Sequence, residues 1–270
     1  MNILILGDIV GKAGRKAVFD HLPTLREKLK IDFVVANGEN AAHGFGITEQ
    51  ICASMYELGV DVITTGNHIW DQREIMNYID NDPRLLRPLN FPKGTPGAGL
   101  GVYFSAKGKR VLVLNLMGCL FMDSLDDPFA KVQESLKDFD LGVDVDAIIV
   151  DFHGEASSEK QAMGCILDGL VTVIIGTHTH VPTADHQVLP KGSAYQTDIG
   201  MTGDYNSVIG MKKEVAVERF MTKVSKGRLE PAEGPATLCG VFVVTDDLTG
   251  LANKISPLRI GGSLSQVLPA

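Results

Sequence analysis

The chain has 270 residues, of which 44% are hydrophobic and 21% charged, and its formal net charge at pH 7 is −8. A chain of this length and composition can bury a substantial core, but its negative charge disfavours gripping long nucleic acid through many phosphates. Because no apolar run reaches bilayer length and the start of the sequence lacks the regions of a signal peptide, we expect a cytoplasmic protein with no membrane partner.

Short apolar runs alternate with helical patterns along the first two-thirds of the chain. Continuous Val, Ile and Leu runs, rather than strict alternation, indicate strands covered on both faces, as in a parallel sheet flanked by helices. The predicted strands cover residues 3–6, 33–36, 60–63, 147–150 and 171–175. The predicted helices cover 15–29 and 51–58 with Thr48 as the N-cap of the second; a third opens at Asp71, where Glu74 suggests a capping box, and a fourth begins near Ser158.

Two further stretches predict antiparallel hairpins. Residues 101–116 turn at 107–109, and residues 237–260 turn at 246–250. No internal repeat, low-complexity tract or linker interrupts the chain. We therefore expect an α/β fold with a mixed, two-sheet core and outer helices, built as a single domain over residues 1–270.

Polar residues follow directly after five of the apolar runs, with glycines close by. In α/β sheets, ligands collect outside the carboxyl ends of the strands, and glycine lets the backbone turn sharply there. Neighbouring strands would therefore bring these side chains to one rim. They are Asp8, Glu39, Asn40, Asn67, His68, His153, His178 and His180, which include four of the seven histidines.

The chemistry of this set favours a metal site. It offers carboxylate, amide and imidazole groups and no thiolate, which suits divalent ions such as Mn, Fe or Zn; the four cysteines are scattered, with no C-x-x-C pair. Taken singly, Asp8 is as well explained by a helix cap, and His153 by a structural hydrogen bond. Two imidazoles at His178 and His180 after a buried strand carry more weight. The cluster is large enough for two ions sharing a carboxylate, an arrangement that serves phosphoryl displacement.

Six motifs, taken in chain order, carry a resemblance to a known family. They are Gly7-Asp8-Ile9-Val10-Gly11, Gly38-Glu39-Asn40, Gly66-Asn67-His68, His153, Gly176-Thr177-His178-Thr179-His180 and the run 197–203. The chain resembles calcineurin-like metallophosphoesterases, and more closely their YmdB-like branch, over almost its whole length. The resemblance implies a four-layer α/β/β/α sandwich, a dinuclear centre and phosphodiesterase activity, notably on 2′,3′-cyclic nucleotides.

The resemblance also implies a role for each matching residue. Asp8 and His180 would hold the first metal, Asn67, His153 and His178 the second, and Glu39 would bridge the two. His68 would stand beside the leaving group, where it donates a proton or stabilises developing charge.

Three positions depart from the usual superfamily pattern. Val10 replaces a histidine of the first motif, so one ligand of the first metal is missing, and the neighbouring Asn40 could supply a substitute oxygen. Glu39 stands where aspartate is usual. Ile69 stands where an acidic residue is usual, so a backbone carbonyl or another carboxylate, such as Asp71, would orient His68.

The resulting hypothesis is hydrolysis of a small phosphodiester or nucleotide by a hydroxide that bridges two ions, Fe or Mn, with Zn as an alternative. Two other functions stay open: a phosphomonoesterase or nucleotidase on the same centre, and a regulatory or RNA-associated protein whose metals are structural. The sequence shows no basic pocket for a dianionic monoester, and the spare His68 favours catalysis over a closed structural site. Apolar residues at 119–122 are compatible with a homo-oligomer.

Overall fold

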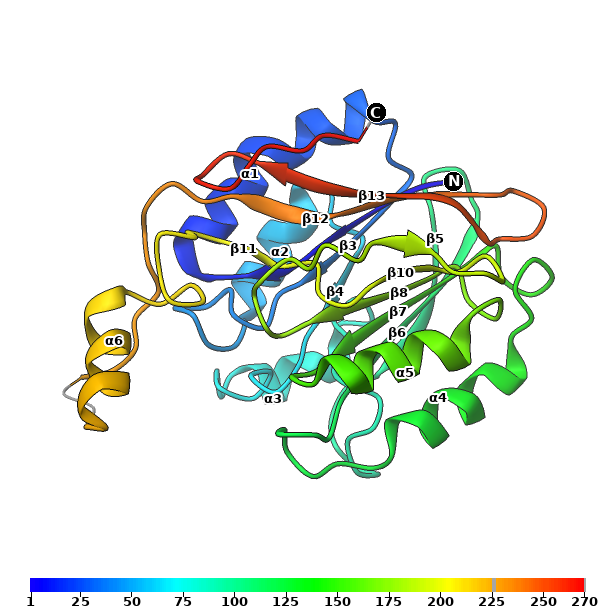
Figure 1. Ribbon diagram of the computed structural model, residues 1–270. Helices are drawn as coiled ribbons and strands as arrows, with labels where there is room; N and C mark the ends of the chain where they lie inside the picture. The colour runs from blue at the N-terminus through cyan, green and yellow to red at the C-terminus, as the bar shows by residue number, and fades with distance from the viewer. Residues whose placement is uncertain (225–226, 270) are drawn as a thin grey trace.

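The computed structural model describes residues 1–224 and 227–269; residues 225, 226 and 270, which the expected 1–270 domain includes, lie outside the described residues. The chain folds as an α/β protein around two mixed sheets, so the predicted fold class is confirmed. Helices α1 (Gly11–Lys28) and α2 (Glu49–Glu57) cover one sheet, and α4 (Pro128–Ser135) and α5 (Ser157–Leu167) cover the other (Figure 1).

The first sheet contains the first and the last strand of the fold, in the strand order β13-β12-β1-β3-β4. Its strands are β1 (Asn2–Leu6), β3 (Phe33–Asn37), β4 (Val62–Thr64), β12 (Leu238–Thr245) and β13 (Ala252–Ile260). β1 runs parallel to β3 and antiparallel to β12, which places the C-terminal hairpin beside the first strand. The predicted strands at 3–6, 33–36 and 60–63 and the hairpin at 237–260 are confirmed within a few residues.

The second sheet has the order β5-β6-β7-β8-β10-β9. Its strands are β5 (Leu100–Phe104), β6 (Arg110–Met117), β7 (Ala147–His153), β8 (Val173–Thr177), β9 (Gln187–Val188) and β10 (Ala194–Gln196). β5 and β6 form the predicted antiparallel hairpin, while β6, β7 and β8 run parallel. Because β7 and β8 are parallel neighbours, they end at the same edge of the sheet.

Three hydrophobic clusters fill the spaces between the layers. One lies between α1, α2 and the first sheet and includes Leu4, Leu6, Val18, Leu22 and Met55. The second lies between the two sheets and includes Ile3, Ile5, Val113, Ile149 and Ile175. The third lies between the second sheet and its helices and includes Leu114, Val150, Val132, Met163 and Leu167. Alternate residues of one strand thus enter different clusters, which explains the continuous apolar runs.

The predicted helix termini are correct in one case and wrong in another. Thr48 caps α2, and its hydroxyl accepts a hydrogen bond from the Ile51 N–H at 3.3 Å. The helix predicted to open at Asp71 is absent: α3 (Ile75–Tyr78) is a single turn followed by a 3₁₀ turn at Ile79–Asn81. The Asp71 carboxylate contacts the His68 ring instead of capping a helix.

Several short or peripheral elements were not predicted. These are α4, its 3₁₀ extension at Leu136–Asp138, β9, β10, and α6 (Lys213–Thr222), which projects from the periphery of the molecule (Figure 1). β2 (Asp8–Ile9) and β11 (Met201–Thr202) also form a separate two-stranded parallel sheet. This small sheet brings the motif at 197–203 alongside Asp8. Within the part of the chain that the structure describes, no helix has the length and apolar character to cross a membrane.

Candidate metal centre

His153, the last residue of β7, is completely buried and has a defined tautomer. Its Nδ1 lies 2.9 Å from the Thr177 hydroxyl, and that hydroxyl donates to Oδ1 of Asp151 at 2.7 Å. Since the hydroxyl has only one hydrogen, it must accept a hydrogen bond from Nδ1–H of His153. The neutral ring therefore presents the lone pair of Nε2 to its other neighbours, as a metal-binding imidazole does.

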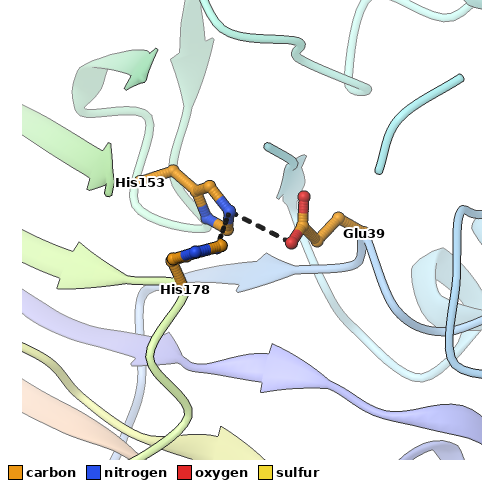
Figure 2. Close-up of side chains that lie close together, drawn as sticks. All are labelled: Glu39, His153 and His178. Atoms are coloured by element: carbon orange, nitrogen blue, oxygen red, sulfur yellow. Dashed lines mark hydrogen bonds and ion pairs between the residues drawn. The ribbon is translucent and has the colours of Figure 1, made fainter. Parts of the chain in front are cut away.

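Three side chains from other segments surround this Nε2 atom. Glu39 Oε1 lies 3.0 Å away, Asn67 Oδ1 3.0 Å and His178 Nδ1 3.1 Å. The ligand atoms of Glu39, His153 and His178 all lie within 4.8 Å of one another, and their side chains point toward a common position (Figure 2). Glu39 Oε1 is buried and forms no hydrogen bond of proper geometry with the part of the chain that the structure describes. One nitrogen cannot satisfy three such neighbours, whereas a cation between them can.

A second group of ligand atoms surrounds Oδ1 of Asp8, which is buried and has no hydrogen-bond partner among the described residues. His180 Nε2 lies 3.8 Å from this oxygen and 3.3 Å from Asn40 Oδ1. Because Nδ1–H of His180 donates to the Ile209 carbonyl at 2.8 Å, Nε2 carries the lone pair. The Asn40 amide nitrogen donates to the Gly44 carbonyl at 3.0 Å, which leaves Oδ1 facing the site.

Electrostatics couple the two groups. Burial alone would lower the pKa of His153, but the charges of Glu39 and Asp8 outweigh burial and raise it to about 9, so without a cation the ring also holds a proton on Nε2, which a bound cation would displace. Burial likewise works against ionisation of Glu39, but His153 and the contacts with His68 hold the pKa of Glu39 well below its usual range. Burial, with the nearby His153 charge, lowers the pKa of His178 to about 3, so this ring is neutral and able to act as a ligand.

Gly66 provides the space in which these side chains meet. A Cβ atom at this position would lie 2.2 Å from His153 Cδ2 and 2.5 Å from Glu39 Oε2. Any other residue would displace the two side chains, so the backbone before Asn67 has to be glycine. The orphaned carboxylate oxygens, the two imidazole lone pairs and this close backbone approach fit divalent metal ions.

His68 lies at the edge of the cluster. Its Nδ1 contacts Asp71 Oδ2 at 2.7 Å, its backbone N–H donates to Glu39 Oε2 at 3.1 Å, and its side chain is 27% exposed. Asp71 is thus the carboxylate that orients the ring. The ring lines a cavity of about 250 Å³ together with Glu39, Asn40, His178 and His180, so it can reach a bound molecule without belonging to either group of ligand atoms.

A buried ion pair holds the loop that carries His178 and His180, whose φ angles of 97° and 65° are uncommon for residues other than glycine. Thr179, between them, donates its N–H and its hydroxyl to Oδ2 of Asp198 at 3.1 and 2.7 Å. Lys160 Nζ donates to the same oxygen at 2.8 Å, and both charged side chains are 1% exposed.

The sequence interpretation missed three supporting residues. Lys160 carries no local signal, because only the packed structure shows that it is buried. Asp198 lies in the quoted motif at 197–203, which marked the segment but not the function of the side chain. The Ile209 carbonyl could not be found either, since a backbone acceptor leaves no mark on residue type.

All eight predicted site residues come together, although not at the edge of one sheet. Asp8, Glu39, Asn40, Asn67 and His68 follow strands of the first sheet, whereas His153 and the loop bearing His178 and His180 belong to the second. The site therefore lies where the carboxyl ends of strands from two facing sheets converge. His43, in the loop that follows Asn40, is exposed and does not line the 250 Å³ cavity.

Comparison with known proteins gives a consistent picture. A family model described as "YmdB-like protein" matches residues 4–258. A protein of Bacillus subtilis (strain 168) named 2′,3′-cyclic-nucleotide 2′-phosphodiesterase is 48% identical over 260 residues, which cover 96% of this chain and 97% of that protein. The structure of a hypothetical protein from Thermus thermophilus has a TM-score of 0.90 at 40% identity, covering 97% of this chain and 100% of that one. A structure described as a novel phosphatase from Mycoplasma pneumoniae has a TM-score of 0.89 at 37% identity, covering 97% and 93%.

Proposed function

This chain belongs to the YmdB-like family and is a phosphoric ester hydrolase, and from that premise we propose that it is a phosphodiesterase with two metal ions that hydrolyses 2′,3′-cyclic nucleotides or similar small phosphodiesters. The observation that carries the proposal is the pair of orphaned buried oxygens, Asp8 Oδ1 and Glu39 Oε1, each facing an imidazole lone pair. The substrate class is taken from the name of the Bacillus subtilis relative.

The contacts support a ligand assignment for each ion. Asp8, Asn40 and His180 would hold the first ion, Asn67, His153 and His178 the second, and Glu39 would bridge them. Asn40 thereby supplies the oxygen that compensates for Val10, the position where the superfamily usually has histidine. The donors suit Fe or Mn, with Zn as the alternative. We also propose a single catalytic domain and a cytoplasmic site of action.

The mechanism divides between the ions and the protein. Bound divalent ions would lower the pKa of a coordinated water and neutralise charge on the phosphoryl oxygens. His68 would protonate the departing ribose oxygen, because Asp71 fixes Nδ1 and leaves the opposite ring nitrogen for the substrate. Thr177 and the Ile209 carbonyl keep His153 and His180 in the tautomers that present lone pairs to the ions.

The proposal is tested by elemental analysis of the purified protein, coupled to an assay on 2′,3′-cyclic AMP. We expect about two bound transition-metal ions per chain, turnover that a chelator removes, and recovery when Mn is added back. A parallel comparison of bis-p-nitrophenyl phosphate with p-nitrophenyl phosphate separates the alternatives. Cleavage of the monoester alone would show a phosphomonoesterase, and bound metal without any cleavage would show a binding protein.

Substitution of His68 by alanine is expected to separate metal binding from turnover. The metal content should stay at the wild-type level because the side chain belongs to neither ligand group, while kcat should fall by roughly 10²- to 10⁴-fold, the usual contribution of a general acid. The measurement is metal content and kcat on 2′,3′-cyclic AMP, with the exposed His186→Ala as a matched control. A His68→Ala protein that turns over at the wild-type rate would rule out this role.

A further inference from the structure

The cavity over the ligand cluster has two chemically different walls. One wall consists of the polar residues of the centre, including Glu39, His68 and His178. The other wall is apolar and consists of Phe45, Ile209, Met211 and Leu229. A substrate whose phosphate lies among the ligand side chains would therefore present another part of its structure to an apolar surface.

A larger apolar cavity, of about 430 Å³, begins at this wall. The two cavities share Ile209, Met211 and Leu229, so they adjoin each other, and we call the pair the trough. Beyond the shared residues, Val208 and Lys223, the C-cap of α6, line the cavity. The rest of its lining comes from α6 itself: Ala216, Arg219 and Phe220. The volume is in the range of small-molecule sites, and α6 lies at the periphery of the molecule (Figure 1).

Two apolar side chains of this trough are exposed, whereas Met211 and Ala216 are buried. Phe220 is 70% exposed and Ile209 is 54% exposed. Ile209 also has a φ of 45°, a strained conformation for a β-branched residue. Its carbonyl accepts the hydrogen bond from His180 at 2.8 Å, so the residue that fixes the tautomer of a ligand histidine also presents its side chain to the trough. The apolar wall and the ligand cluster are thereby held in a fixed relation.

We propose that the apolar trough binds the nucleobase of the substrate, with Phe220 as its stacking surface; this inference rests on the proposed function. The phosphate would lie at the polar end, the ribose beside Ile209, and the base between Met211, Leu229 and Phe220. Stacking of a base on an aromatic side chain is favourable whichever base it is, because every base has a π-face. We accordingly expect a preference for nucleotides over base-free phosphodiesters, with little discrimination among the four bases.

The test compares two substrates with the same scissile bond: 2′,3′-cyclic AMP and methyl β-ribofuranoside 2,3-cyclic phosphate, which lacks a base. For Phe220→Ala, the advantage of the nucleotide in kcat/KM should fall about tenfold, mostly through KM, as expected for the loss of one stacking contact. Phe220→Tyr should retain the advantage. Met221→Ala is the matched control, because Met221 is the next residue of α6, is 80% exposed and lines a different hollow.

The outcomes separate this inference from the function on which it rests. If the wild-type protein cleaves both substrates equally well, or if Phe220→Ala changes both kcat/KM values alike, the trough does not bind the base and the phosphodiesterase assignment stands. If neither substrate is cleaved, the proposed function itself is wrong. Sedimentation analysis of the same variants covers the remaining occupant: a dimer that Phe220→Ala dissociates and Met221→Ala leaves intact would show that a second copy of the chain occupies the trough, and would overturn the inference.

Discussion

Replacement of Glu39 by glutamine is expected to abolish turnover and to remove bound metal at the same time. The carboxylate is fully buried, and the contacts with His153 and His68 keep its pKa well below the usual range, so it is ionised at neutral pH. Glutamine has the same shape but no charge, and its amide would place an N–H group against the His68 N–H or the His153 ring. Loss of a bridging anion costs several kcal/mol of stabilisation, which corresponds to a decrease in kcat of roughly a thousandfold or more.

The measurement is metal content per chain together with kcat on 2′,3′-cyclic AMP. Glu134→Gln, on α4 with its side chain 72% exposed, removes one carboxylate far from the site and should change neither quantity. Circular dichroism of the Glu39→Gln protein should match the wild type, since the substitution conserves volume. If Glu39→Gln retained two bound ions and full activity, the ligand assignment would be wrong.

Replacement of Asp198 by asparagine is expected to give the largest loss of stability. Lys160 would keep its charge in a site that is 1% exposed, without a counter-ion. Oδ2 of Asp198 also accepts hydrogen bonds from the N–H and the hydroxyl of Thr179, and an amide nitrogen in its place could not accept them. Removal of one partner from a buried ion pair costs about 3–5 kcal/mol. We expect the free energy of unfolding to fall by that amount in urea titrations performed with chelator present.

A second measurement shows whether the pair also positions the ligand loop. Because Asp198 holds Thr179 between His178 and His180, metal affinity at a temperature where the variant stays folded should fall by about 10- to 100-fold, as for other supports of metal ligands.

The combination of Asp198→Asn with Lys160→Met should lower the free energy of unfolding by less than the sum of the two single changes. The exposed pair Lys16 and Asp20, 68% and 38% exposed, is the control, and Lys16→Met should cost less than about 1 kcal/mol. If Asp198→Asn left the metal affinity unchanged, the ion pair between Lys160 and Asp198 would have a structural role alone.

Local pattern was sufficient for the elements that carry the site. Continuous apolar runs predicted β1, β3, β7 and β8, because strands buried on both faces need apolar residues at successive positions. The polar residues after these runs predicted the ligand set, because the carboxyl ends of parallel strands share an edge. The prediction that a helix opens at Asp71 was wrong for the same reason, because it too rested on local pattern alone. A short polar side chain that starts a helix and one that orients a histidine look alike in sequence, and only the position of the His68 ring distinguishes them.

The sequence by itself determined the residue types of the centre and the strands that deliver them, since both depend on neighbours a few positions away. The tertiary structure alone decided which ring nitrogen of His153 and of His180 is available, through Thr177 and the Ile209 carbonyl, and that each of the two groups of site residues combines side chains from both sheets. It also decided that Lys160 is buried against Asp198 and that α6 places Phe220 in a trough beside the site. These features join segments far apart in the chain, so they follow from how the sheets and helices pack rather than from any local periodicity.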